Sequence, residues 1–462
     1  MNLTPKTNAK SFVLNALLNK NRSVSIIWYF IFLNVLVLDL FAGACRVLAQ
    51  PQKIDSLLTL LQTTKADTAR VKLLYGLANE YSFLKPDKAV EYAKQGLALS
   101  EKIDYKNGQS ICFNALGLAY FQMGKYDTAM VCFERRHGLA RELKDSIGIA
   151  NVYDNMGVIY FQLGDSKKAI NLRESANLIY SSHNENSLLA SGYVWIGNIY
   201  KEQAEYPIAL EYYLKAFQIY EKENNEKDIG YPLINISSIY RYLKQYEKAK
   251  QYALDAKDKF ARANIPQGVG AALYRLALIF NEEGDFENTV KYLTEAKAIF
   301  DEIQALSNQT LVNTLLGTTF HKHGQNDKAL VYFNMALTIA QEIGDKRIIS
   351  TLYQNIGTTY YDKRDYMKAL GYMHKTDIIL KEINDKYAML ENYENYIKLY
   401  ARINQPDNVV KYFKSYHELA DTIFSEQNAK AIAEMQTKFE TERKDKEILT
   451  LNLESEEKKK TI

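Results

Sequence analysis

Three asparagines, Asn155, Asn235 and Asn355, are the first polar side chains whose spacing suggests chemistry, because multiples of forty residues separate them. A side-chain amide both donates and accepts hydrogen bonds, so it can recognise another polar group without reacting with it. Two interpretations are open for these amides. They contact a ligand, or they lie on a helix surface and bond to a neighbouring helix. Both indicate recognition rather than covalent catalysis.

Covalent, metal and cofactor chemistry find no support in the sequence. His321 and His323 are two residues apart, so on a helix they point to different faces and do not form a metal site together. Gly268-Val-Gly lacks the third glycine of a dinucleotide-binding loop. Neither a serine nucleophile elbow nor an HExxH metal motif occurs. We therefore expect no enzymatic activity within this chain, no metal and no cofactor.

An aromatic residue recurs every forty positions, and this is the strongest pattern in the chain. Its eight members are Tyr120, Tyr160, Tyr200, Tyr240, Phe280, Phe320, Tyr360 and Tyr400. A small residue precedes seven of them by three positions, namely Gly117, Gly157, Gly197, Ser237, Ala277, Gly317 and Gly357. Aromatic residues make up 12% of the sequence, so eight in one phase are not expected by chance. A period of this length is typical of stacked repeats.

Each forty-residue copy has the pattern of two antiparallel helices. Apolar side chains recur at helical spacing in both halves, as Leu116 and Tyr120 illustrate in the first. Gly124 marks the turn between the halves of one copy, and Pro207 falls near the first turn of a helix in another. The small residue lets the two helices approach closely, and the aromatic fills the gap to the next copy. Because one pair cannot bury its apolar face alone, about nine stacked hairpins are predicted over residues 67–425.

These hairpins resemble the tetratricopeptide repeat (TPR). The pattern of that family is leucine, glycine and tyrosine in the first helix, then alanine, an aromatic and alanine in the second. Its counterparts here include Ile196-Gly197, Tyr200, Ala209, Tyr213 and Ala216. The period of forty exceeds the usual 34, so each helix is longer. The resemblance implies an all-α, right-handed superhelical solenoid.

The resemblance also implies where a ligand binds. TPR proteins bind along the inner face lined by the first helices. In peptide-binding members an asparagine at the place of Asn155, Asn235 and Asn355 holds the main chain of the ligand. Other residues expected on this face are Phe121, Phe161, Asn198, Lys201, Arg241, Tyr274, Gln354 and Tyr361. Aromatic and amide groups together suit an extended peptide, so a peptide or protein is the expected ligand.

The charge balance excludes some classes of partner. The 462 residues include 58 basic and 55 acidic side chains, which gives a formal net charge of +3. The excess of positive charge lies in the first 49 residues, so the remainder is close to neutral. A nucleic acid partner is therefore not expected. With 47% hydrophobic and 24% charged residues, the chain has a globular composition.

Residues 1–49 have the pattern of a signal peptide. Arg22 precedes an apolar run that begins at Ile26, and a peptidase site fits cleavage after Ala49. Two alternatives remain open, which are lipidation of Cys45 and an uncleaved membrane anchor. All three predict export, with a periplasmic location and, in the last two, attachment to the membrane.

Segments on either side of the repeats complete the predicted organisation. Residues 50–66 are expected to form a lead-in helix, and residues 426–462 a long charged helix that lacks proline and glycine. Ile432, Met435 and Phe439 begin an apolar seam in this tail. The tail is therefore a coiled coil that forms a homodimer or a solvated single helix, and it leads towards a membrane span beyond the chain.

The order of these segments adds a second resemblance. A signal peptide, TPRs and a tail that contains Met435-Gln-Thr-Lys-Phe-Glu are similar to the exported sensory region of bacterial TPR-containing sensor histidine kinases and helix-turn-helix regulators. This implies the input region of a two-component type membrane regulator. The alternative is a periplasmic TPR adaptor, scaffold or lipoprotein with no signalling role.

Cys112 and Cys132 are the two cysteines outside the signal peptide, and they fall on successive predicted helices. An oxidising compartment would allow them to form a disulfide. Two buried, small apolar side chains fit the pattern better, because their offsets from the turn between the helices are unequal.

Overall fold

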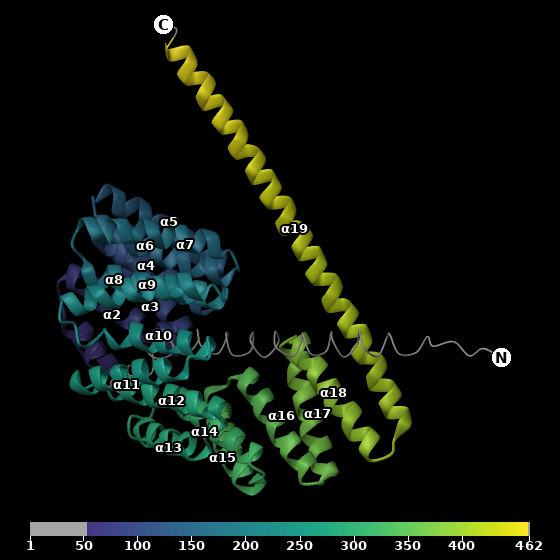
Figure 1. Ribbon diagram of the computed structural model, residues 1–462. Coiled ribbons are helices and arrows are strands. Elements are labelled where there is room, and N and C mark those ends of the chain that lie inside the picture. The colour runs from purple at the N-terminus through teal and green to yellow at the C-terminus, as the bar shows by residue number, and fades with distance from the viewer. Residues whose placement is uncertain (1–52, 461–462) are drawn as a thin grey trace. The chain divides into compact units, whose positions relative to one another are not determined.

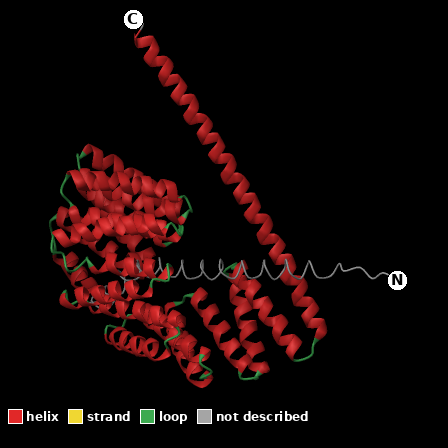
Figure 2. Ribbon diagram, viewed as in Figure 1, coloured by secondary structure: helices red, strands yellow, loops and turns green. Residues whose placement is uncertain are grey.

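The computed structural model of the protein describes residues 53–460, so the predicted signal peptide and Cys45 lie outside the described residues. All regular structure within that range is helical, and it contains no strand (Figure 2). A helix over 53–63 precedes the helices that Figure 1 labels α2 to α19. Their bounds are α2 Asp67–Leu84, α3 Pro86–Lys102, α4 Lys106–Gln122, α5 Tyr126–Glu142, α6 Ser146–Gln162, α7 Ser166–Ser182, α8 Asn186–Glu202, α9 Tyr206–Lys222, α10 Gly230–Tyr242, α11 Tyr246–Arg262, α12 Pro266–Glu283, α13 Phe286–Glu302, α14 Leu306–Lys322, α15 Asn326–Ile343, α16 Lys346–Asp362, α17 Tyr366–Glu382, α18 Lys386–Arg402 and α19 Pro406–Lys460.

The chain divides into two compact units, Met1–Thr319 and Phe320–Ile462, with the boundary inside α14. In the first unit each first helix packs on the helix that follows it, from α2 on α3 to α12 on α13. In the second unit α16 packs on α17 and α18 on α19. The predicted all-α fold of stacked helical hairpins is confirmed, and in chain order α2 to α19 form nine pairs.

The turns between helices repeat twice as often as the hairpins. From Asp104 to Asn404, every twentieth residue has a positive φ. At the first such turn after α4, the Gly124 N–H donates to the Phe121 carbonyl and the Lys125 N–H donates to the Tyr120 carbonyl, both at 2.9 Å. This pair of bonds satisfies carbonyls that the helix end leaves free. The carbonyl of the recurring aromatic residue therefore helps to close each turn inside a hairpin.

Ala204 is one of the turn residues whose side chain disfavours a positive φ, and its replacement by glycine is expected to stabilise the fold. Its φ of 59° lies in the left-handed region, where a Cβ is unfavourable by about 1–2 kcal/mol. Glycine removes that strain but loses more chain entropy on folding, so we expect a net gain of about 0.5–1 kcal/mol in the free energy of unfolding. Urea unfolding measures it. Gly284→Ala, at a φ of 81°, is the matched control and should destabilise; equal effects of the two substitutions would contradict this explanation.

Close helix approach at the small positions is confirmed. A Cβ on Gly197 of α8 would lie 2.6 Å from the Tyr213 ring of α9, and one on Gly117 of α4 would lie 2.6 Å from the Phe133 ring of α5. Such distances leave no room for a side chain, so glycine at this position sets the spacing of the two helices.

The recurring aromatic ring has contacts in two directions. Tyr200 stacks on Tyr212 of its own hairpin, with ring centroids 5.7 Å apart and an angle of 14° between the planes. It also packs against a cluster that contains Ile236 and Ile239 of the next copy. The ring therefore joins the helices of one hairpin as well as filling the gap to the following one.

Helix α19 continues far beyond the last hairpin. It runs unbroken for 55 residues, and its first part packs on α18 while Ile432 and Met435 are 57% and 71% exposed. None of the described helices contains a stretch that is long and apolar enough to cross a membrane.

Candidate functional site

The three predicted asparagines occupy the same position on α6, α10 and α16, but their surroundings differ. The Asn155 amide donates to Asn114 Oδ1 at 3.1 Å, which links α6 to α4. Asn235 is fully buried, and neither its Oδ1 nor its Nδ2 has a hydrogen-bond partner among the described residues. Asn355 is half-buried in the second unit. Of the two interpretations, bonding to a neighbouring helix therefore describes Asn155, and Asn235 has unused hydrogen-bonding capacity.

Predicted residues on α8 and α10 make polar contacts in the first unit. Asn198 Oδ1 accepts a bond from the Tyr213 hydroxyl at 2.7 Å and lies 3.5 Å from the Lys201 ammonium nitrogen. Arg241 pairs with Glu282 of α12. Its guanidinium also lies 4.4 Å from the centroid of the Tyr242 ring. Because α10 contacts both α8 and α12, these side chains form one polar region on the first-helix face of the first unit.

Burial changes the protonation of this region. It lowers the pKa of Lys201 to about 7, helped by the positive charges of Arg275 and Arg241 and opposed by Glu202. It raises the pKa of Glu202 to about 7, opposed by Lys201. Both changes follow from removing a charged group from water. Burial likewise raises the pKa of Tyr274, against the effect of Arg275.

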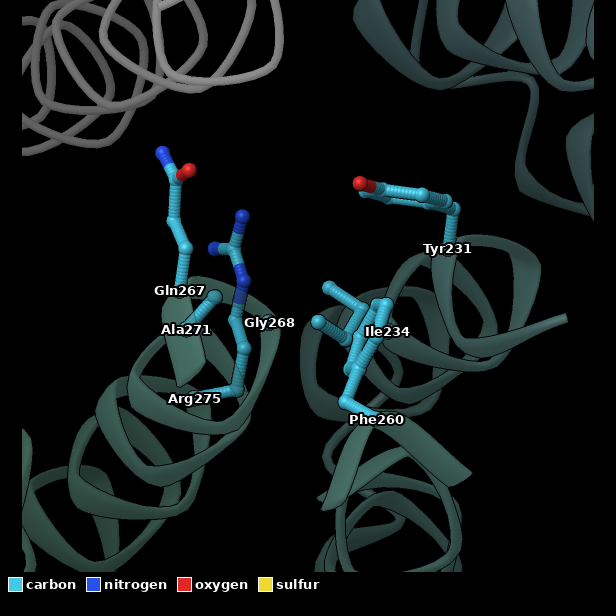
Figure 3. Close-up of a pocket in the computed structure, with 7 residues that line it drawn as sticks. All are labelled: Tyr231, Ile234, Phe260, Gln267, Gly268, Ala271 and Arg275. Carbon is cyan, nitrogen blue, oxygen red and sulfur yellow. The ribbon is translucent and has the colours of Figure 1, made fainter. Parts of the chain in front are cut away.

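A small cavity opens in the same unit between α10 and α12. Its volume is about 20 Å³, and it is lined by Tyr231, Ile234, Phe260, Gln267, Gly268, Ala271 and Arg275 (Figure 3). Helix α10 has 13 residues where the neighbouring first helices have 17 or 18, because it begins only at Gly230. The Phe260 ring lies where a Cβ on Gly230 or Gly268 would be, at 2.5 and 2.4 Å. The shortened helix and these two glycines thus make room for the ring and for the cavity beside it.

The sequence did not identify two polar residues of this region, Arg275 and Gln267. Both are 4% exposed, although α12 is otherwise apolar along this stretch. Arg275 lies forty residues after Asn235, in the register of the predicted asparagines. The forty-residue register places Arg275 with the predicted asparagines, but a pattern defined by asparagine does not include an arginine.

The remaining predicted residues lie in separate places. Phe121 packs on Tyr126 with centroids 5.7 Å apart, and the edge of Phe161 meets Trp195 at 5.8 Å. In the second unit Tyr361 meets Tyr366 edge to face at 5.6 Å.

Gln354 also lies in the second unit, where it hydrogen-bonds to Glu391. Burial raises the pKa of Glu391, and the bond to Gln354 opposes this. The predicted inner-face residues therefore do not form a single site. Those with the most polar neighbours lie on α8 and α10.

The described residues contain no group of side chains that could hold a metal ion. Cys112 and Cys132 are both buried and free. Burial raises the pKa of these thiols to about 12 and about 11, so they remain protonated at neutral pH. The polar region can thus bind and orient a ligand through hydrogen bonds and charge.

Comparison with known proteins gives a family match and several structural likenesses. The family model of the SusR N-terminal TPR domain matches residues 48–305, more than half of the chain. No curated protein matches.

Two solved structures illustrate the likeness. A signal transduction ATPase with numerous domains and a tetratricopeptide repeat sensor, from Pyrococcus horikoshii, is 18% identical with a TM-score of 0.50 over 73% of this chain and 54% of that one. The apo quorum sensor NprR from B. thuringiensis is 15% identical with a TM-score of 0.49 over 74% of this chain and 97% of that one. At such identities the likeness concerns the fold alone.

Proposed function

The chain belongs to the family of SusR N-terminal TPR domains, and from this premise we propose that the first-helix face of its hairpins binds an extended peptide or a segment of a protein. A TPR fold is a protein-interaction scaffold and not an enzyme fold, in agreement with the absence of catalytic motifs from the sequence. The peptide ligand and the location of its site are the proposed part.

Asn235 is the observation that carries the proposal. A fully buried amide with no partner for either polar atom is unfavourable by roughly 1–3 kcal/mol, and native proteins rarely leave one so. The main chain of an extended peptide offers one donor and one acceptor per residue, which is the complement that this amide requires.

Replacing Asn235 by leucine is expected to weaken peptide binding by about tenfold or more, because the two bonds to the ligand main chain are lost. The probe is a displayed library of random peptides, selected on the full chain and then titrated against each variant. Asn171→Leu, which removes an exposed amide from the second helix α7, is the control and should leave binding unchanged. A library from which nothing is retained, or peptides that bind both variants equally, would refute the proposed site.

We further propose that the chain is exported and forms the sensory input of a membrane signal-transduction regulator, with α19 as the element that transmits the signal. The signal-peptide pattern of residues 1–49 and the unbroken passage from the last hairpin into α19 support this role. A ligand transmits a signal only if it binds one of two states better than the other. Ile432 and Met435 are exposed on α19, where they can pack against a second copy of the helix. In this proposal the two states differ in how the α19 helices of a homodimer pair.

The second candidate function is a periplasmic adaptor or scaffold that binds constantly and transmits nothing. Crosslinking of a Met435→Cys variant, with and without a selected peptide, separates the two. A crosslink yield that changes with peptide supports the sensor, and an unchanged yield supports the adaptor. Glu426→Cys, on the opposite side of α19, is the matched control for random collision.

A further inference from the structure

The hairpin stack of the second unit ends at α19. Helix α18 packs along the first part of α19, and α19 is the last helix in the described part of the chain (Figure 1). Earlier second helices such as α15 and α17 end after 18 and 17 residues, whereas α19 continues unbroken for 55 and does not turn back to cover its own first part. In a solenoid each repeat covers the one before it, so the last repeat exposes the surface that the earlier ones bury.

Phe413 of α19 occupies a position that every earlier second helix from α5 to α17 buries. It is 53% exposed, whereas its counterparts in steps of forty residues are at most 8% exposed. These counterparts are Phe133, Arg173, Tyr213, Ala253, Leu293, Phe333 and Met373. Met373 of α17 belongs to a cluster with Tyr393 and Tyr396 of α18, so the position faces the first helix of the next hairpin. Phe413 therefore lies where a further helix would pack.

An apolar stripe continues from Phe413 in both directions along α19. Val410 is 68% exposed, and Phe424 is 65% exposed although it lies beyond the length of the earlier second helices. Ala420 lies between them and is half-buried, whereas its counterpart Leu380 is 1% exposed. Their spacing places these side chains on one face of the helix. An exposed apolar surface of this kind marks a contact with another macromolecule.

Two charged side chains border the stripe on the side away from α18. Lys414 and Asp421 are both exposed and lie seven residues apart, so they share one side of the helix. If a second α19 lies antiparallel against the stripe, with Phe413 against Phe424, then Lys414 of each copy lies beside Asp421 of the other. In a parallel arrangement this border would meet the side of α19 that packs on α18, and neither ion pair would form.

The direction of the stack favours the same arrangement. Successive helices are joined by short turns and pack along each other, as α17 and α18 do, so each runs antiparallel to the one before it. A helix that takes the place of the next first helix therefore runs antiparallel to α19.

We propose that this open end of the second unit, formed by residues 410–424 of α19, binds the same surface of a second copy of the chain. The antiparallel pair has two-fold symmetry, so each stripe is covered by the other and both Lys414–Asp421 pairs form. The inference does not depend on the proposed peptide site. It also differs from a contact through Ile432 and Met435, because the two α19 helices run in opposite directions beyond Phe424 and these side chains do not meet.

Analytical ultracentrifugation of the full chain at micromolar concentration tests the contact. We expect a dimer, and Phe413→Glu is expected to weaken self-association by about tenfold or more, because it places two charges in the apolar interface. Ile378→Glu, at a side chain of α17 that is 67% exposed, is the matched control in the same unit and should leave the dimer unchanged. A monomer at all concentrations, or a dimer that Phe413→Glu leaves intact, overturns the proposal.

Charge reversal tests the antiparallel direction. Lys414→Asp and Asp421→Lys each bring like charges together twice across the interface, so each alone is expected to weaken the dimer by about tenfold. Mixing the two variants should restore the dimer, because both contacts of the mixed pair again join opposite charges. A mixture that stays monomeric overturns the antiparallel arrangement. A dimer that Met435→Glu abolishes and that both charge reversals leave unchanged assigns the contact to the tail and likewise overturns the proposal.

Discussion

Replacing Tyr213 by alanine is expected to lower the free energy of unfolding by about 3–5 kcal/mol, which is the range for removing a large buried aromatic side chain. Tyr213 is 0% exposed and packs directly against Gly197, which has no side chain to fill the space. Its hydroxyl also donates to Asn198 at 2.7 Å. Urea unfolding, followed by circular dichroism, measures the loss.

Tyr213→Phe is the matched control, because it keeps the ring and removes only the bond to Asn198. The expected loss is then about 1 kcal/mol. A loss for Tyr213→Ala that does not exceed the loss for Tyr213→Phe would show that the contact with Gly197 does not carry the stability of this hairpin.

The pairing of Gly197 with Tyr213 shows how far the sequence predicts the fold. The forty-residue period identifies the small position, and the predicted close approach of two helices is confirmed there. The partner of the glycine varies from copy to copy, however. Phe133 faces Gly117, whereas the space beside Gly157 is limited by the Ala169 carbonyl oxygen. Periodicity thus predicts the register of the helices but not which atoms fill each gap.

The candidate site was less predictable than the fold, because its properties depend on neighbours that the period does not specify. Asn155 and Asn235 share one register, yet Asn155 bonds to Asn114 and Asn235 has no partner. The difference arises from the residues on adjacent helices. The cavity depends in turn on the late start of α10 at Gly230, where the regular length of the first helices is broken. A repeating pattern does not predict an irregularity of this kind.

The left-handed turn residues keep their spacing in both compact units, with Gln304 in the first and Gly324 in the second. The period therefore predicts the local structure of each unit.

Replacing Lys201 by methionine is expected to stabilise the protein by about 1–3 kcal/mol at pH 6, although it removes a residue of the predicted inner face. The side chain is 4% exposed, and methionine retains most of its volume without its charge. A purely structural lysine would destabilise when removed. If the variant is more stable but binds the selected peptides less well, Lys201 is a residue retained for binding.

The stabilisation expected from Lys201→Met should decrease as the pH rises. Burial, with Arg275 and Arg241, lowers the pKa of Lys201 from 10.5 to about 7. Below pH 7 the lysine is charged in both the folded and the unfolded chain, so the unfavourable burial of its charge is fully present. Between pH 7 and 10.5 the folded chain binds fewer protons than the unfolded one. The destabilisation caused by the buried charge of Lys201 therefore declines as the pH rises. The stabilisation by Lys201→Met should therefore be larger at pH 6 than at pH 9.

Glu202→Gln provides the matched variant with the opposite sign. Burial raises the pKa of Glu202 from 4.5 to about 7. The destabilisation caused by burying this carboxyl group therefore grows as the pH rises from 4.5 to 7. The gain from Glu202→Gln should accordingly be larger at pH 8 than at pH 4. Chemical denaturation of both variants at these pH values tests the pair, and parallel pH profiles for Lys201→Met and Glu202→Gln would show that burial does not govern the charges of these two side chains.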